Sequence, residues 1–216
     1  MIAIVDYKAG NLTSVQLALK EVGFNGTITS DRQEILNADR VIFPGVGAAG
    51  AAMEHIHQLD LSNILKDFVA TGKPLLGICV GAQIILERSE ENNNTPCIGL
   101  IPGEAKHFKT SETHPIKIPQ IGWNQVAFKQ KHPIFNNIDS EADFYFVHSY
   151  YPVPSDSKYS FAETTYGNTT FSSVIGRDNL IACQFHLEKS GTYGLQLLKN
   201  FCLWNGQFSA VDSEVC

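Results

Sequence analysis

The chain has 216 residues, of which 44% are hydrophobic, so it can bury one large core, and we expect a single domain over residues 1–216. Its formal net charge of −6 at pH 7 argues against a nucleic-acid partner, and no apolar run approaches the ~20 residues that span a membrane. The five cysteines are scattered without a C-x-x-C pair, which favours reduced thiols in the cytoplasm over disulfides or a metal site.

Strand and helix patterns alternate through the first part of the chain. Residues 2–6 are apolar and β-branched, and apolar side chains recur at helical spacing over 12–22. A short apolar strand is predicted at 40–43, a helix at 64–70 and a further strand at 75–79. This alternation predicts an α/β fold with a mostly parallel central sheet and helices on both faces.

After residue 87 this alternation ends. The polar, Asn-rich segment 89–95 is expected to be a loop, whereas 195–204 returns to helical spacing and should pack on the sheet. Between them, strand-like runs occur at 115–118, 143–147, 160–163, 171–175 and 180–185. We therefore expect an additional antiparallel or mixed strand region in the second half of the chain.

The most informative pattern is a candidate nucleophile elbow around Cys79. The strand at 75–79 runs into the sequence GICVG at 77–81, and a helical pattern starts directly behind it. Glycines on both sides of a nucleophile permit the sharp strand-to-helix turn that exposes it. The unpaired N–H groups and dipole of the helix N-terminus favour the thiolate of such a cysteine. The other cysteines lack this frame, so Cys79 is the predicted nucleophile.

A cysteine nucleophile needs a base, and the base needs an orienting group. His186 is the best placed of seven histidines, because it ends an apolar strand, where functional groups gather in α/β sheets. In extended backbone, residues i and i+2 face the same side, so Glu188 is expected to hold the imidazole of His186. We therefore predict a triad of Cys79, His186 and Glu188.

One competing pattern indicates a nucleotide site. Residues 45–50 read GVGAAG and formally match the dinucleotide-binding fingerprint G-x-G-x-x-G. That fingerprint belongs to the first strand–helix unit and needs an acidic residue at the end of the next strand, ~20 residues later. Here the glycines follow a later strand, and Asp67 lies within a helical pattern. No cofactor is therefore expected.

At these motifs the chain resembles a known family. GICVGAQ at 77–83 and QFHLE at 184–188 are similar to the two signatures of class I glutamine amidotransferases. Four further segments resemble the glutaminase subunits of imidazole glycerol phosphate synthases, which act in histidine biosynthesis: DYKAGNL at 6–12, PGVG at 44–47, GWN at 122–124 and YFVHSY at 145–150. The resemblance covers essentially the whole chain. Leu187 and Lys8 depart from it, since the family commonly has proline and glycine there.

The resemblance implies a fold and an activity. The fold would be a flavodoxin-like three-layer sandwich, and the activity would be hydrolysis of glutamine to glutamate and ammonia. The N–H of Val80 and an N–H of the loop with Val46 and Gly47 would hold the oxyanion. The residues that would position glutamine are Gln83, Gly47, His148, Ser149 and Tyr150.

The resemblance also implies a heterodimer. A cyclase subunit with a (β/α)₈ barrel would receive the ammonia and make imidazole glycerol phosphate and aminoimidazole carboxamide ribotide. The partner-facing rim would comprise Trp123, Asn124, Tyr145 and Lys189. Three alternatives stay open at this point: a paralogue that supplies ammonia to a surface-sugar amidotransferase or another synthase, a cysteine peptidase or thiol hydrolase, and a non-enzymatic regulatory subunit.

Overall fold

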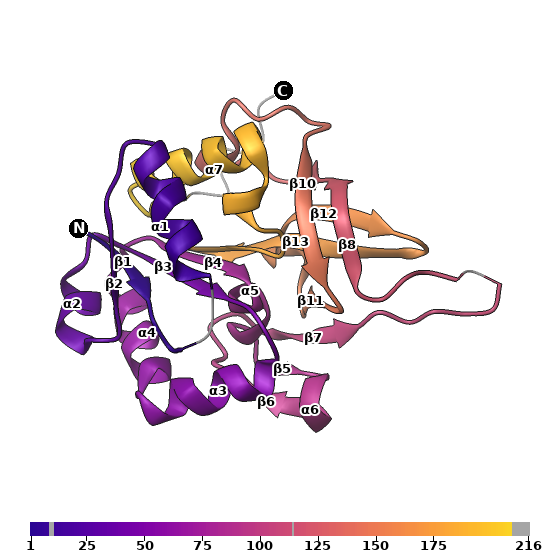
Figure 1. Cartoon of the computed structure of the whole chain (residues 1–216), viewed down its shortest axis with the longest axis horizontal. Helices are drawn as coiled ribbons and strands as arrows, with labels where there is room; N and C mark the ends of the chain where they lie inside the picture. The colour runs from indigo at the N-terminus through magenta and orange to yellow at the C-terminus, as the bar shows by residue number, and fades with distance from the viewer. Residues whose placement is uncertain (9–10, 114, 209–216) are drawn as a thin grey trace.

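The computed structural model describes residues 1–8, 11–113 and 115–208. They are built around a central eight-stranded sheet (Figure 1). Its strands are β1 (Ile2–Val5), β2 (Gly26–Thr29), β3 (Arg40–Gly45), β4 (Leu75–Cys79), β9 (Ala127–Phe128), β12 (Ser160–Tyr166), β13 (Thr169–Arg177) and β14 (Leu180–Cys183). They follow the order β2-β1-β3-β4-β14-β13-β12-β9. The pairs from β2 to β14 are parallel and the pairs from β14 to β9 are antiparallel. The sheet is thus mixed and mostly parallel, as expected.

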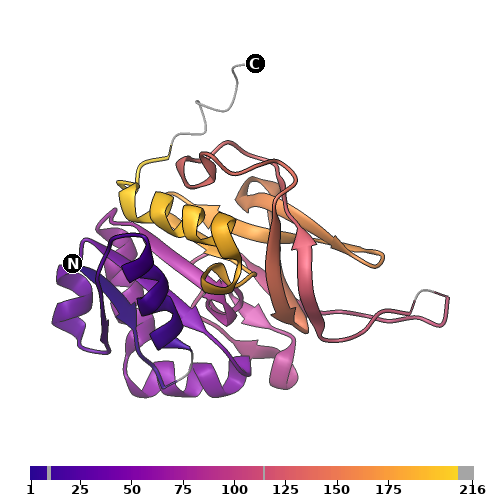
Figure 2. The same ribbon diagram turned by 45° about the horizontal axis from the view of Figure 1, so that its top comes forward.

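Helices cover both faces of this sheet (Figures 1 and 2). On one face lie α1 (Leu12–Glu21) and α7 (Gly191–Leu203), which contact each other. On the other face lie α2 (Arg32–Asn37), α3 (Ala49–Gln58) and α4 (Leu61–Ala70). A short helix, α5 (Val80–Ile84), continues directly from β4. The expected α/β fold with helices on both faces is therefore confirmed.

Hydrophobic burial explains why these segments form these layers. Every residue of β1, β4 and β14 is buried, as parallel strands covered on both faces require. Helix α4 buries Leu61, Ile64, Leu65 and Phe68, a spacing of three and four residues that places them on one stripe. The core therefore lies in two layers, one on each face of the sheet.

Two smaller sheets flank the central one. Strand β8 (Gln120–Gln125) pairs with β10 (Asp143–His148), and a four-stranded sheet contains β5 (Arg88–Ser89), β6 (Thr95–Pro96), β7 (Gly103–His107) and β11 (Tyr150–Pro154). Only Ser149 separates β10 from β11, so the chain passes from one sheet to the other at this residue. The expected additional antiparallel strand region is confirmed.

Two local predictions were wrong. Residues 115–118 form no strand, and the prolines at 115 and 119 explain this, since neither has an N–H to donate to a neighbouring strand. The segment 89–95 is not a plain loop, because it contains parts of β5 and β6 and the short α6 (Glu91–Asn94), in which Asn92 and Asn93 have positive φ. The remaining short elements are η1 (Pro133–Phe135), η2 (Ser157–Tyr159) and η3 (Leu187–Lys189).

Helix length and cysteine pairing bear on the class of protein. Within the described ranges, no helix combines the length and the apolar character needed to cross a membrane. The four cysteines of these ranges, Cys79, Cys97, Cys183 and Cys202, are free thiols, whereas Cys216 lies outside the described residues.

His132 is a buried histidine that joins η1 to the C-terminal end of α7. Its ring centroid lies 4.7 Å from that of Trp204 and 5.5 Å from that of Phe161. Its Nδ1 accepts a hydrogen bond of 3.2 Å from the N–H of Ile134, so that nitrogen carries no proton. Burial lowers the pKa of His132 to about 4, which keeps the ring neutral in the folded protein at neutral pH.

We predict that His132 makes folding sensitive to acid. Unfolding restores the ordinary pKa of 6.5, so the unfolded state gains the proton first as the pH falls through 6.5 toward about 4. At about pH 5 this costs about 2 kcal/mol of unfolding free energy. The side chain of His132→Asn can still accept the hydrogen bond from Ile134. Between about pH 7.5 and 5, the free energy of unfolding of this variant should therefore fall by about 2 kcal/mol less than that of the wild type, as measured by denaturant titration.

The matched control is His57→Asn, which changes an exposed histidine on α3. It should show the same acid sensitivity as the wild type. An identical loss of stability in the His132 variant and the wild type would contradict the assignment.

Candidate active site

The backbone turn at Cys79 builds the centre of the site. Strand β4 ends at Cys79 and α5 begins at Val80, and Cys79 adopts φ 55° and ψ −109°, an uncommon conformation for a residue other than glycine. A Cβ added at Gly81 would lie 2.1 Å from the carbonyl oxygen of Phe43, and one at Gly77 would lie 2.8 Å from Cβ of Ala182. The predicted elbow is therefore present, and both glycines are required by close packing.

His186 and Glu188 meet through a tight turn and not through extended backbone. Strand β14 already ends at Cys183, and residues 187–189 form the 3₁₀ turn η3. Nδ1 of His186 lies 2.8 Å from Oε1 of Glu188. The expected contact is thus made, but the extended geometry from which it was predicted is wrong, since the chain turns away from the sheet after β14. The turn forms with Leu187 in the place where proline is common.

Hydrogen bonds from β10 hold this turn in position. The N–H of His186 donates to the carbonyl of Tyr145 at 2.9 Å, and the N–H of Tyr145 donates to Oγ of Ser190 at 2.9 Å. The Ser190 hydroxyl in turn donates to the carbonyl of His186 at 2.5 Å. The base is therefore fixed by the antiparallel strand region as well as by the central sheet.

The charge state of His186 follows from its neighbours. Burial lowers the pKa of this imidazole, but hydrogen bonds and negative charge from Cys79 and Glu188 outweigh burial and raise it to about 10. Oε2 of Glu188 has no hydrogen-bond partner among the described residues, and the Glu188 side chain is only 2% exposed. The buried carboxylate therefore depends on His186, and the imidazole is charged at neutral pH.

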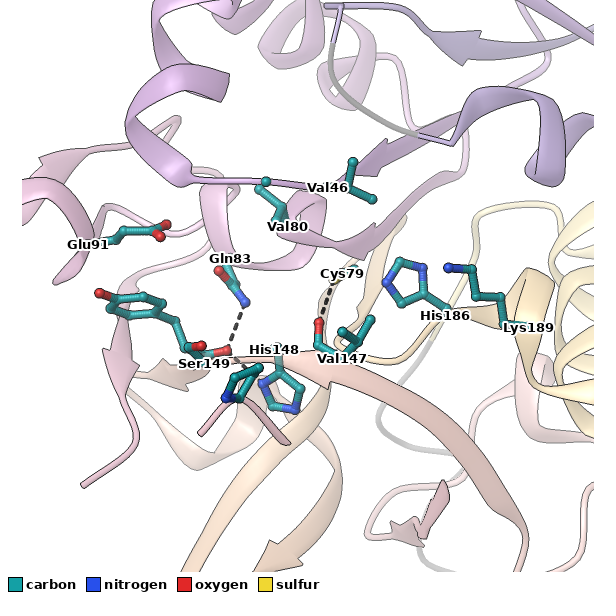
Figure 3. A pocket seen from close by; sticks show the side chains of 13 residues that line it. Val46, Cys79, Val80, Gln83, Glu91, Val147, His148, Ser149, His186 and Lys189 are labelled. Atoms are coloured by element: carbon teal, nitrogen blue, oxygen red, sulfur yellow. Dashed lines mark hydrogen bonds between the residues drawn. The ribbon is translucent and has the colours of Figure 1, made fainter. Parts of the chain in front are cut away.

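A cavity of about 310 Å³ joins the predicted residues (Figure 3). Its walls are Val46, Gly47, Cys79, Val80, Gln83, Glu91, Pro119, Val147, His148, Ser149, Tyr150, His186 and Lys189. Figure 3 places His186 and Lys189 on one side of Cys79 and Gln83 and Glu91 on the other. Every residue expected to position glutamine lines this cavity, and Glu188 stands behind His186.

The two segments expected to hold an oxyanion also meet at the cavity. Val80 is the first residue of α5, so its N–H has no acceptor within the helix. Val46 and Gly47 follow β3, and Gly47 has φ 89° with no atom within 4 Å of an added Cβ. Because Gly45 is in register with Cys79 on the neighbouring strand, this loop leaves the sheet beside the nucleophile.

Sequence reasoning missed two polar side chains of the site. Gln184 is fully buried, and its Nε2 lies 3.8 Å from Sγ of Cys79. It lies in a motif of the resemblance, but no role was predicted for it. Glu91 lines the cavity and accepts a 2.6 Å hydrogen bond from the N–H of Ala49, at the start of α3. Its Asn-rich surroundings carried no signal of a binding site.

The residues expected at the partner-facing rim are divided between two places. Trp123 is 56% exposed on β8 and lies edge-on to Tyr145 of β10, with ring centroids 6.1 Å apart. Lys189 is exposed and borders the cavity. Trp123 and Tyr145 do not line the cavity, but Cη2 of Trp123 would lie 3.7 Å from a Cβ added at Gly191, two residues after Lys189. Asn124 points to the opposite face of β8, where its Nδ2 donates to the carbonyl of Thr165 at 2.9 Å. Its side chain is therefore occupied within the chain.

Comparison with known proteins identifies close full-length relatives. The family model "Glutamine amidotransferase class-I" matches residues 3–204. A relative from Maridesulfovibrio salexigens, "Imidazole glycerol phosphate synthase subunit HisH", is 54% identical over 205 residues and covers 93% of this chain and 95% of that protein. A protein of the same name from Nitrosococcus oceani is 46% identical over 207 residues, with coverage of 95% and 98%.

Solved structures support the fold. A structure described as a glutamine amidotransferase aligns with a TM-score of 0.70 at 14% identity and covers 94% of this chain and 98% of its own. The structure of PurLQS from Thermotoga maritima aligns with a TM-score of 0.70 at 16% identity, with coverage of 94% and 97%. The expected fold of class I glutamine amidotransferases is thereby confirmed. The chain is an enzyme of the class I glutamine amidotransferase family and, within it, belongs to the HisH subunits.

Proposed function

We propose that this chain hydrolyses glutamine to glutamate and ammonia through Cys79, His186 and Glu188, and passes the ammonia to a cyclase subunit. The observation that carries the proposal is that a strained cysteine and a charged imidazole meet at one cavity, with a buried carboxylate hydrogen-bonded to the imidazole. Such an arrangement supports acyl transfer from an amide to a thiol.

The first half of the reaction forms a thioester. The Cys79 thiolate attacks the side-chain carbonyl carbon of glutamine, and the oxygen becomes an oxyanion held by N–H groups of Val80 and of the Val46–Gly47 loop. Each such donor typically contributes ~3 kcal/mol. The C–N bond then breaks, and the His186 imidazolium gives its proton to the departing nitrogen, which leaves as ammonia.

The second half regenerates the enzyme. Neutral His186 takes a proton from water, and the hydroxide attacks the thioester carbon. Collapse of this intermediate breaks the C–S bond, so glutamate leaves and Cys79 returns as a thiolate beside the imidazolium. Glu188 keeps the ring oriented in both halves and stabilises its positive charge. One water is consumed and one ammonia is released per glutamine.

The cavity wall suits the two ends of glutamine. Both acceptors of the Gln83 amide N–H₂ lie within the protein, at Tyr150 and Gln184, so its oxygen remains for a donor on the substrate. Glu91 offers a carboxylate that complements an α-ammonium group, and Lys189 offers a cation near the cavity mouth. The backbone of residues 148–150 completes the wall, as proposed from the resemblance.

We further propose that the chain acts as one domain in a cytoplasmic heterodimer with a (β/α)₈-barrel cyclase, which makes imidazole glycerol phosphate and aminoimidazole carboxamide ribotide. The name that these relatives share supports this, because it describes a subunit of imidazole glycerol phosphate synthase. Ile121 and Trp123 expose apolar side chains on β8, and Trp123 lies against Tyr145 of β10. The exposed Lys189 lines the cavity. Such a surface suits a protein partner that collects the product.

We predict that Cys79→Ala abolishes glutamine hydrolysis, because among the described residues no other cysteine lines the cavity. Glutamate release is measured with the cyclase subunit and its acceptor nucleotide present. Cys97→Ala is the matched control, since burial raises the pKa of the Cys97 thiol to about 12 and this thiol does not line the cavity. That control should keep full activity, and turnover by the Cys79 variant would refute the proposal.

Glu188→Gln should lower kcat by about 10²–10⁴-fold, because the imidazolium loses its buried counter-charge and its orienting acceptor. The pKa of His186 is raised partly by Glu188, so it should fall in this variant. The alkaline limb of the rate–pH profile should therefore move to lower pH. Glu163→Gln removes a surface carboxylate paired with Lys129 and serves as the control. An unshifted alkaline limb in Glu188→Gln would argue against this role.

Trp123→Ala should weaken binding of the cyclase subunit by about 2 kcal/mol or more, roughly 30-fold in Kd, because exposed tryptophans at interfaces are common hot spots. Titration calorimetry measures this directly. Leu17→Ala removes a similarly exposed apolar side chain, 61% accessible, on α1 and should leave Kd unchanged. Equal affinities for the wild type and the Trp123 variant would place the interface elsewhere.

A further inference from the structure

A second buried amide side chain contacts the nucleophile. Gln184 follows β14, whose residue Cys183 is in register with Ile78 on β4, so Gln184 lies beside Cys79 on the neighbouring strand end. Its side chain has no exposed surface, and its Nε2 donates toward Sγ of Cys79 at 3.8 Å. The contact joins residues 105 positions apart.

Gln83 determines which end of the Gln184 amide faces the sulfur. Nε2 of Gln83 donates to Oε1 of Gln184 at 3.0 Å and to the carbonyl of Tyr150 at 2.8 Å. Because Oε1 of Gln184 is thus the acceptor for Gln83, the N–H₂ end of Gln184 must point the other way, toward Cys79. A chain of hydrogen bonds therefore runs from Tyr150 through both glutamines to the nucleophile.

We propose that Gln184 is a further catalytic residue, which stabilises the Cys79 thiolate by donating an N–H to its sulfur. This inference deepens the proposed function and rests on it. A thiol can donate to the carbonyl of Val147, 3.9 Å from the sulfur, but a thiolate has no proton to give and gains from donors instead. Gln184 supplies such a donor from a buried position, where hydrogen bonds to charge are strong.

The same amide pair links the nucleophile to substrate positioning. Gln83 lines the cavity and holds Gln184, while its own orientation is fixed by Tyr150. Loss of Gln184 should therefore affect two properties: the pH at which Cys79 becomes reactive, and the KM for glutamine. If the Gln184 side chain only filled space, its replacement would leave the pH dependence of Cys79 reactivity and of the KM for glutamine unchanged.

The test is the pH dependence of Cys79 alkylation by iodoacetamide in the full chain, followed by mass spectrometry of the modified residue. Gln184→Met keeps the volume but removes the donor, and the midpoint of the alkylation rate should rise by about one pH unit, a tenfold loss of thiolate at limiting pH. With the cyclase subunit present, kcat/KM for glutamine should fall about tenfold or more.

Two variants keep this test decisive. Gln184→Leu also removes the donor and adds no charge, so it should raise the midpoint as well, and it replaces Gln184→Met in the test if that variant does not fold. Asn179→Leu removes another buried amide, at the start of β14, which donates to the carbonyls of Val69 and Lys73, and its midpoint should match the wild type.

An unchanged midpoint in the folded Gln184 variants, or an equal rise in Asn179→Leu, would overturn the inference. Alkylation does not involve glutamine. If the wild-type chain with the cyclase subunit releases no glutamate, the proposed function is wrong. The alkylation experiment still tests the role of Gln184 in that case, so the two failures are distinguishable.

Discussion

The arrangement of the site depends on the conformation of one residue. Cys79 joins a buried parallel strand to a helix with a positive φ, and the surrounding backbone approaches so closely that Gly77 and Gly81 cannot carry side chains. The core must hold this conformation, because a non-glycine residue does not adopt it freely. The fold thus uses its most buried region to present one sulfur at a cavity.

The parallel part of the sheet explains why the other groups reach the same place. Strands β3, β4 and β14 are adjacent, and their carboxyl ends lie at one edge. The loop after β3 brings Gly47, the turn after β4 brings Cys79, and the segment after β14 brings Gln184 and His186. In open α/β sheets this edge is where ligands bind, because the loops that leave parallel strands converge there.

The antiparallel strands close the site and connect it with the surface. Strand β10 anchors the turn that carries the base, and the passage from β10 to β11 at Ser149 supplies one wall of the cavity. Strand β10 also pairs with β8, where Trp123 is exposed and lies against Tyr145. A partner bound at this surface would therefore be mechanically connected to the position of His186.

The sequence by itself determined the features that depend on neighbouring residues. The alternating strands and helices of the first part, the glycine-flanked elbow at Cys79 and the choice of His186 follow from local spacing and turn chemistry. The tertiary structure alone decided the 3₁₀ turn that joins His186 to Glu188, the pairing of β8 with β10, and the places of Gln184 and Glu91 at the site. These depend on contacts between residues that are distant along the chain, where no local period exists to indicate which side chains will meet.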